Sequence, residues 1–284
     1  MKIKNNLVEK LLHPAFLGLI IWAIILPFQP LKFDKFKITK TATEIPNNYG
    51  TNYFFDIDND GNSEKLLIDL ADPGITKLVF FSGDRIIDQY NFRFHPVYLG
   101  NNIYFADYNH DGFSECFLFT ASDDSIFLNI VDPLGLRKTI INKRFVDFRH
   151  RAPDSTDPPS INPAGMYNKN REDGLSDLIF YIGAGFCLQP RNVYRYMIKE
   201  DSLLKSAKSG ASITYSVLTD ITGDTVPEII TGQNASGNLG SDFPYTDHYS
   251  WLMVYDINME FLFEPLRMGK HPGFLEVVPV RKGN

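Results

Sequence analysis

Short apolar runs alternate along the chain with polar turns that are rich in Asp, Asn and Gly. The main runs are Leu66-Leu67-Ile68, Phe117-Leu118-Phe119, Leu178-Ile179-Phe180-Tyr181 and Ile229-Ile230. Apolar runs of this length between turn residues are typical of strands, and helical signals are sparse after residue 30. With 23 Phe, 14 Tyr, 20 Gly and 17 Pro in 284 residues, the pattern predicts an all-β protein with many turns.

The acidic turns recur at a regular spacing. They begin at Asp56, Asp107, Lys169 and Asp220, and the first and last intervals are equal. The longer middle interval contains a Pro/Ser/Asp-rich segment, Arg151 to Ser160, which is typical of an exposed loop. Each unit is predicted to hold a strand, an acidic loop, a second strand and a hairpin. Four strands in about 50 residues are the pattern of a β-propeller blade, so four clear repeats are expected.

The first acidic loop has the composition of a calcium site. Its candidate ligands are Asp56, Asp58, Asp60, the backbone carbonyl of Asn62, and Glu64. Oxygen ligands at alternate positions around a tight turn suit a hard cation such as Ca²⁺. Without a cation, each pair of carboxylates roughly 5 Å apart costs about 3 kcal/mol at an effective dielectric of about 20. The alternative is a turn that is capped only by its own side chains.

The other copies keep this pattern to different degrees. The second loop offers Asp107, Asn109, Asp111 and Glu115, and we expect it to bind Ca²⁺ as well. The fourth offers Asp220, Thr222, Asp224 and Glu228, where the threonine is a weak ligand, so we expect weaker binding. The third loop places Lys169 and Arg171 at ligand positions, and these cations predict that it binds no metal.

The N-terminus has a different character from the rest of the chain. Leu11 to Phe28 is almost wholly apolar, follows three lysines, and is not followed by a small-residue cleavage site. We therefore expect residues 1–30 to form an uncleaved signal anchor or transmembrane helix, and residues 31–284 to form the propeller region. A removed signal peptide and a buried helix are the alternatives. Lysines on both sides leave the membrane orientation undecided.

Charge and cysteine content narrow the function classes. The net charge of −6 and the lack of a Lys/Arg cluster argue against a nucleic-acid partner. Weak calcium loops suit an extracytoplasmic setting, at the cell surface or in the periplasm. Cys116 and Cys187 are expected to be free thiols, with a disulfide between them as the alternative.

The acidic loops, the apolar strand after each and the segment Gly183-Ala184-Gly185 resemble FG-GAP/VCBS repeats, which form integrin-α-type β-propellers. The resemblance covers roughly residues 45 to 265 and implies mainly structural Ca²⁺ in the loops. More loosely, the chain is similar to the extracytoplasmic sensor region of membrane-bound histidine kinases. Such propellers usually have seven blades. The chain therefore forms either a small propeller or the front of a longer protein, and His271 to Val280 predicts the opening of a fifth blade.

These features predict a non-catalytic module that binds a protein or carbohydrate ligand, or that acts as a sensor. The six histidines show no ligand spacing, and no nucleophile motif is present, so we do not expect an enzyme. The candidate contact surfaces are the segments from Pro153 to Pro163 and from Gln233 to Tyr249. A carbohydrate- or lipid-active enzyme built on the same repeats and a cell-surface adhesion protein are the alternatives.

Overall fold

The computed structural model describes residues 51–72, 74–93, 95–96, 102–135, 138–150, 160–168, 174–183, 188–239, 242–269 and 274–278. All of these residues belong to one compact unit, which spans residues 48–284. Every regular element among them is a β-strand. Over these ranges no helix is long and apolar enough to cross a membrane, and the predicted anchor at residues 1–30 lies outside them.

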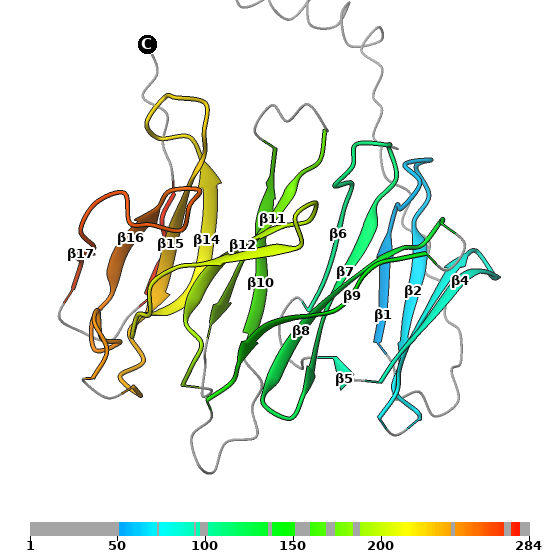
Figure 1. Cartoon of the computed structure of the whole chain (residues 1–284), viewed down its shortest axis with the longest axis horizontal. Coiled ribbons are helices and arrows are strands. Elements are labelled where there is room, and N and C mark those ends of the chain that lie inside the picture. The colour runs from blue at the N-terminus through cyan, green and yellow to red at the C-terminus, as the bar shows by residue number, and fades with distance from the viewer. Residues whose placement is uncertain are drawn as a thin grey trace, which may run out of the picture. The chain divides into compact units, whose positions relative to one another are not determined.

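The strands form four antiparallel sheets that follow one another in chain order (Figure 1). The first sheet contains β1 (Thr51–Phe55), β2 (Glu64–Asp69), β3 (Thr76–Ser82) and β4 (Arg85–Phe92). The second contains β5 (His95–Pro96), β6 (Ile103–Ala106), β7 (Glu115–Ser122), β8 (Ser125–Asp132) and β9 (Lys138–Phe148). The third contains β10 (Ser160–Tyr167), β11 (Asp177–Gly183), β12 (Asn192–Met197) and β13 (Ser202–Lys205). The fourth contains β14 (Ser212–Thr219), β15 (Glu228–Asn234), β16 (Trp251–Tyr255), β17 (Leu266–Arg267) and β18 (Phe274–Leu275).

Each predicted repeat is one sheet whose strands pair in sequence order, which confirms the all-β, propeller-like fold class with four repeats. In the second sheet, β5 and β6 both pair with β7 and together occupy the place of one first strand. The fifth blade that we expected near the C-terminus is not seen in the described residues there. Phe274 and Leu275 instead pair with the end of β15, beyond β16, and extend the fourth sheet.

Alternating side chains on the central strands explain why the sheets stack. On β7, Cys116 and Leu118 pack into the core shared with the first sheet, whereas Phe117 and Phe119 pack toward the third. Because successive side chains of a strand point to opposite faces, such a run is buried on both sides. Phe119 meets Phe180 of β11 across this boundary, with ring centroids 4.9 Å apart. Strand β11 repeats the pattern between the second and fourth sheets.

The first sheet is covered less completely. Side chains of β2 alternate between buried and half-buried, and β1 is mostly exposed. Phe54 is 67% exposed. Among the described residues, only one face of this sheet shares a core with another sheet. The period-2 pattern of β2 is thus that of a sheet with one buried face.

Close packing of the third and fourth sheets requires a glycine. A Cβ atom added to Gly183, at the end of β11, would lie 2.3 Å from the carbonyl oxygen of Ile213 on β14. No real side chain tolerates that distance, so the first glycine of the Gly183-Ala184-Gly185 segment serves the approach of two backbones.

The boundary between the second and third sheets should be sensitive to truncation. We expect Phe180→Ala to lower the free energy of unfolding by about 3–5 kcal/mol, because it leaves a cavity beside Phe119. Phe54→Ala is the matched control, and since its ring is exposed we expect a change within about 0.5 kcal/mol. Urea unfolding followed by tryptophan fluorescence measures both variants. Equal effects of the two substitutions would contradict the assignment of the core.

Candidate metal loops and ligand pocket

The first, second and fourth acidic loops share one backbone conformation. Each connects the first strand of its sheet to the second, and its first aspartate caps the turn. Asp56 accepts hydrogen bonds from the N–H groups of Asp60 (3.1 Å) and Gly61 (2.9 Å). Asp107 accepts the equivalent bonds from Asp111 and Gly112 at the same distances. In the fourth loop, Asp220 accepts from Gly223 at 2.6 Å and Thr225 at 2.9 Å. The turn is therefore held by its own side chains, as capped Asx turns are.

The fourth loop adopts this conformation although its glycine lies at a different position of the loop. The first and second loops have positive φ at their fourth and sixth positions, and Gly61 and Gly112 hold the sixth, at 91° and 92°. In the fourth loop, glycine lies at the fourth position, and Thr225 at the sixth has a φ of 72°. Thr225 stands where the other two loops have glycine, but the loop keeps its shape. The left-handed region costs a non-glycine residue about 1–2 kcal/mol.

A buried glutamate closes each of these loops. Glu64, Glu115 and Glu228 are 3%, 2% and 4% exposed, and each accepts a hydrogen bond from the N–H of its loop's second residue. Burial raises the pKa of Glu115 to about 7, with a further contribution from the nearby carboxylates of Asp111 and Asp107. The N–H of Tyr108 acts in the opposite direction. A cation beside such a carboxylate would favour its ionised form.

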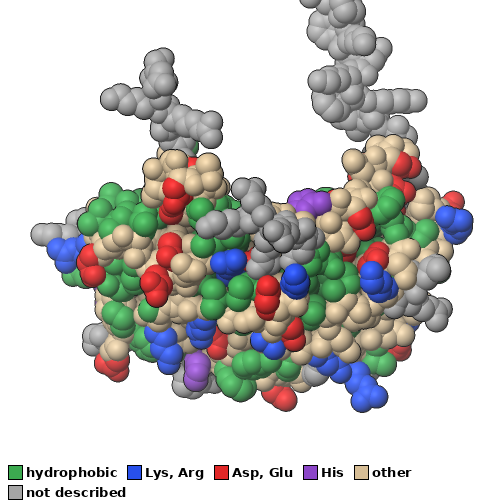
Figure 2. Space-filling model, turned by 45° about the horizontal axis from the view of Figure 1, so that its top comes forward, with side chains coloured by type: hydrophobic (Ala, Val, Ile, Leu, Met, Phe, Trp, Pro, Cys, Tyr) green, Lys and Arg blue, Asp and Glu red, His purple; other side chains and the backbone are tan. Residues whose placement is uncertain are grey.

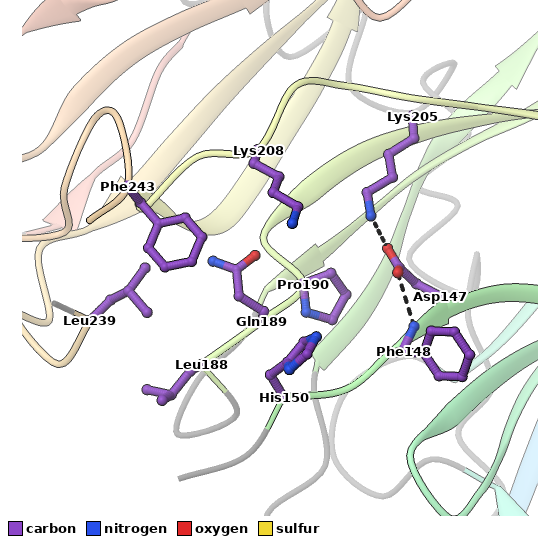
Figure 3. Close-up of a pocket in the computed structure, with 10 residues that line it drawn as sticks. All are labelled: Asp147, Phe148, His150, Leu188, Gln189, Pro190, Lys205, Lys208, Leu239 and Phe243. Carbon is purple, nitrogen blue, oxygen red and sulfur yellow. Dashed lines mark hydrogen bonds and ion pairs between the residues drawn. The ribbon is translucent and has the colours of Figure 1, made fainter. Parts of the chain in front are cut away.

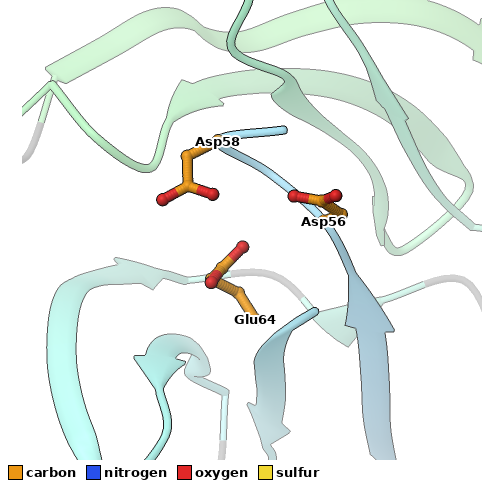
Figure 4. A group of neighbouring side chains, drawn as sticks. All are labelled: Asp56, Asp58 and Glu64. Carbon is orange, nitrogen blue, oxygen red and sulfur yellow. The ribbon is translucent and has the colours of Figure 1, made fainter. Parts of the chain in front are cut away.

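Two loops bring three carboxylates together. Ligand atoms of Asp56, Asp58 and Glu64 all lie within 4.8 Å of one another, and Figure 4 shows the three side chains converging on one space. The fourth loop gathers Asp220, Asp224 and Glu228 in the same way. Convergent carboxylate oxygens are what Ca²⁺ requires. Asp60 does not join the first group, and one of its oxygens accepts hydrogen bonds from the backbone and side chain of Asn62.

The second loop is arranged differently. The amide nitrogen of Asn109 donates to Asp111 at 3.0 Å and to Glu115 at 3.2 Å, so the NH₂ group lies between two carboxylates. The amide oxygen accepts from the N–H of Asp111. An Asn side chain can ligate a cation only through its oxygen, so this amide would have to turn over for Ca²⁺ to bind. The sequence ranks this loop above the fourth, whereas the convergence of carboxylates favours the fourth.

In the third repeat an arginine meets the equivalent carboxylate. Residues 169–173 of this loop lie outside the described part, but Asp177 corresponds to Glu64 and is buried. Arg195 of β12 binds Asp177 through Nε (2.8 Å) and Nη2 (2.7 Å). The same guanidinium donates to the carbonyl oxygen of Ile257 in the fourth repeat (3.0 Å). We did not single out Arg195 from the sequence, although a charge within the apolar run Val193–Tyr196 was the available signal.

Backbone hydrogen bonds connect successive loops. The N–H of Ser114 in the second loop donates to the carbonyl of Ile57 in the first (2.8 Å). The N–H of Ser176 donates to the carbonyl of Tyr108 at 2.7 Å, which joins the third repeat to the second loop in the same way. In both cases the eighth loop position contacts the second position of the preceding loop. The fourth loop has Pro227 at its eighth position, and proline has no N–H to donate.

A pocket of about 480 Å³ lies where the second, third and fourth repeats meet (Figure 3). The residues that line it are Asp147, Phe148, His150, Leu188, Gln189, Pro190, Lys205, Lys208, Leu239 and Phe243. Leu239 and Phe243 belong to the stretch from Gln233 to Tyr249 that the sequence proposes as a contact surface. Most of the other proposed surface, residues 151–159, lies outside the described part.

An ion pair fixes one wall of this pocket. Arg191 and Asp247 are both fully buried, and their Nη1 and Oδ2 atoms are 2.8 Å apart. Asp247 also accepts hydrogen bonds from the N–H groups of Asn238 and Leu239. Burial alone would raise the pKa of Asp247, but the ion pair and hydrogen bonds with Arg191, together with its other donors, hold that pKa below its usual value. This network orders the segment that carries Leu239.

Comparisons with known proteins add little. No family model and no curated protein matches the sequence. Among solved structures, the chain is similar to a crystal structure of BBS1N in complex with ARL6DN, soaked with mercury, at 11% identity and a TM-score of 0.38. That similarity covers 78% of this chain and 69% of the other. At this TM-score it carries no argument about function, and the FG-GAP/VCBS resemblance stays a prediction.

Acid should weaken the Arg191–Asp247 pair. Because the folded-state pKa of Asp247 is lowered, its ionised form contributes stability that is complete above the unfolded value of about 3.9 and is lost as the pH falls through the folded value. At pH 7 we expect Asp247→Asn to cost about 3–5 kcal/mol, since Arg191 stays buried without its counter-ion. The difference in the free energy of unfolding between the wild type and Asp247→Asn should become smaller below pH 4.

Chemical denaturation at pH 7, 5, 4 and 3 measures this dependence. Asp72→Asn is the control, because Asp72 pairs with Lys77 at the surface and should contribute less than about 1 kcal/mol. A constant gap between wild type and Asp247→Asn over the whole pH range would show that Asp247 does not act through its charge.

Proposed function

We propose that this chain is a non-catalytic binding module whose propeller-like repeats are stabilised by Ca²⁺. The observation that carries the proposal is the equivalent placement of acidic loops in separate repeats, two of which gather three carboxylates within 4.8 Å. Every acidic side chain of these two loops accepts a backbone hydrogen bond, but one capping aspartate is enough for such a turn, so the others add negative charge. The added carboxylates repel one another, and a divalent cation would turn that repulsion into attraction.

The proposed ligands follow the loops. Asp56, Asp58 and Glu64 would hold Ca²⁺ in the first loop, and Asp220, Asp224 and Glu228 in the fourth. The second loop would bind after rotation of the Asn109 amide. The third would not bind, because the Arg195 guanidinium already supplies positive charge to Asp177. The resemblance to FG-GAP/VCBS repeats supports the same structural role for calcium.

Calcium in these loops would act on the packing between repeats. The second residue of a loop is tied through its N–H to the closing glutamate and through its carbonyl to the next repeat, as Ile57 shows. A cation bound by Glu64 would therefore also hold Ile57 in place. The carbonyl of Ile57 in turn accepts the hydrogen bond from the following loop. Each sheet of a repeat protein depends on its neighbours for burial, so stiffening this connection should stabilise the whole array.

The apolar segment Leu11 to Phe28 supports membrane anchoring, and calcium loops of modest affinity suit an extracytoplasmic location. We infer that the module presents its loops outside the cytoplasm and binds a protein or carbohydrate ligand, either as a sensor or as a receptor. On the face in Figure 2, Lys and Arg side chains are mixed with Asp and Glu rather than gathered in one patch. The alternative is a carbohydrate- or lipid-active enzyme built on the same repeats.

Calcium titration tests the scaffold. We expect calorimetry to detect Ca²⁺ binding, and a chelator to lower the melting temperature, because each site at 20- to 100-fold excess over its Kd contributes about 2–3 kcal/mol. Asp58→Ala should remove the first site and Asn109→Ala the second, one at a time. Asp72→Asn, an acidic surface residue outside the loops, is the matched control. If the chelator changes neither the stoichiometry nor the melting temperature, the calcium proposal is wrong.

Cell fractionation and an activity screen test the remaining parts. We expect the chain in the membrane fraction, accessible to protease added from outside, because the anchor holds it there. Recovery in the soluble cytosol would contradict the anchor. We expect no turnover of polysaccharides or phospholipids. Turnover that is abolished by a point mutation outside the acidic loops would favour the enzyme alternative.

A further inference from the structure

The pocket at the junction of three repeats carries one lysine whose charge is not matched. Lys205 binds the carboxylate of Asp147, which also accepts from the hydroxyl of Tyr194. Among the residues that the structure describes, no carboxylate forms an ion pair with Lys208. Figure 3 shows the Lys208 ammonium directed into the pocket above Gln189 and Pro190. Among the described residues that line the pocket, Lys208 is therefore the lysine whose charge a ligand can use.

The opposite side of the pocket is apolar. Leu239 and Phe243 from the fourth repeat face the side chains of Gln189 and Pro190, and Leu188 lies below them (Figure 3). This wall offers a ligand the half-buried side chains of Phe243 and Leu188 and the small accessible part of Leu239, but no charge. A volume of about 480 Å³ falls within the range of about 300–1,000 Å³ that is usual for small-molecule sites.

The parts of the pocket are held in place without a ligand. His150 and Gln189 exchange two backbone hydrogen bonds, of 2.9 and 3.2 Å, which join the second repeat to the third. The amide nitrogen of Gln189 donates to the carbonyl of Ser209 (3.3 Å), and its side chain is largely buried. Asp247 fixes the backbone of Leu239 on the other side. A site that is ordered in advance loses less entropy when a ligand binds.

We propose that this pocket binds a small organic monocarboxylate with an apolar body. The carboxylate pairs with the Lys208 ammonium, and the apolar body packs against Leu239 and Phe243. A monoanion fits because Lys205 is already neutralised by Asp147, which leaves Lys208 as the one unmatched lysine among the described lining residues. The proposal rests on the proposed function as a binding module and names the chemical class of its ligand. It does not depend on calcium in the loops.

Three related probes separate charge from apolar contact. We use the full chain and titrate 4-phenylbutyrate, its neutral analogue 4-phenylbutanamide, and butyrate, which lacks the ring, by calorimetry or ligand-observed NMR. We expect saturable binding of 4-phenylbutyrate, and about tenfold weaker binding of each of the other two, since one charge-assisted hydrogen bond or one buried ring supplies that difference.

Variants assign the contacts. Lys208→Gln should weaken 4-phenylbutyrate about tenfold and leave the neutral amide unchanged, which is the signature of a charge pair. Phe243→Ala should weaken both ring-bearing probes. Lys199→Gln is the control, because Lys199 is exposed, carries the same charge and does not line the pocket. Unfolding midpoints verify that each variant is folded.

The outcomes are distinct. Absence of saturable 4-phenylbutyrate binding, or binding that is as strong in Lys208→Gln and Phe243→Ala as in the wild type, overturns the ligand assignment. If chelation still lowers the melting temperature in that case, the calcium scaffold stands and only the pocket proposal falls. If 4-phenylbutyrate binds as expected while chelation has no effect, the pocket proposal stands and the calcium part of the proposed function falls.

Discussion

Burial of both faces of the central strands is the constraint on which the rest of this structure depends. A four-stranded sheet with apolar side chains on both faces cannot exist alone in water, so each repeat is completed by the repeats beside it. Strand β11 shows this directly, because every one of its side chains is buried, those of one face against the second sheet and those of the other against the fourth. Once the sheets are stacked in register, equivalent loops come to equivalent places. The acidic loops are thereby brought within reach of one another's backbones.

The acidic loops gain stability from aspartates that cap the turn and lose stability from the burial of the closing glutamates. Their aspartates cap the turn by accepting backbone hydrogen bonds, and this alone gives the loops a common shape. The closing glutamates are buried, and burial of a carboxylate is unfavourable unless positive charge or hydrogen bonds compensate it. The chain shows three partial answers to this problem. One is the bond from a backbone N–H to each glutamate, another is the Asn109 amide between two carboxylates, and the last is Arg195 against Asp177.

The sequence was sufficient for the architecture and insufficient for the site. Repeated apolar runs and Asp/Gly turns are local signals, and they predicted four sheets and the positions of the first, second and fourth acidic loops. Contacts between strands and between repeats have no local signal. The position of Arg195 against Asp177 depends on strand pairing between β11 and β12, and the pocket depends on segments from three repeats. Whether Asn109 presents its oxygen or its nitrogen is a choice of rotamer, which composition cannot decide. The short β18 was misassigned for the same reason, since its partner lies some 40 residues away in the chain, about the length of a repeat.

Because Pro227 has no N–H to donate, the boundaries between repeats differ in how well they tolerate amino-acid substitutions. Where Ser114 and Ser176 donate through their backbones, almost any replacement of the side chain keeps the bond, and only a change to proline removes it. Between the third and fourth repeats, one connection instead runs through the side chain of Arg195 to the carbonyl oxygen of Ile257, just after β16. A single missense change can delete that connection. We therefore expect side-chain substitutions to be tolerated less well at the boundary between the third and fourth repeats than at the two boundaries before it.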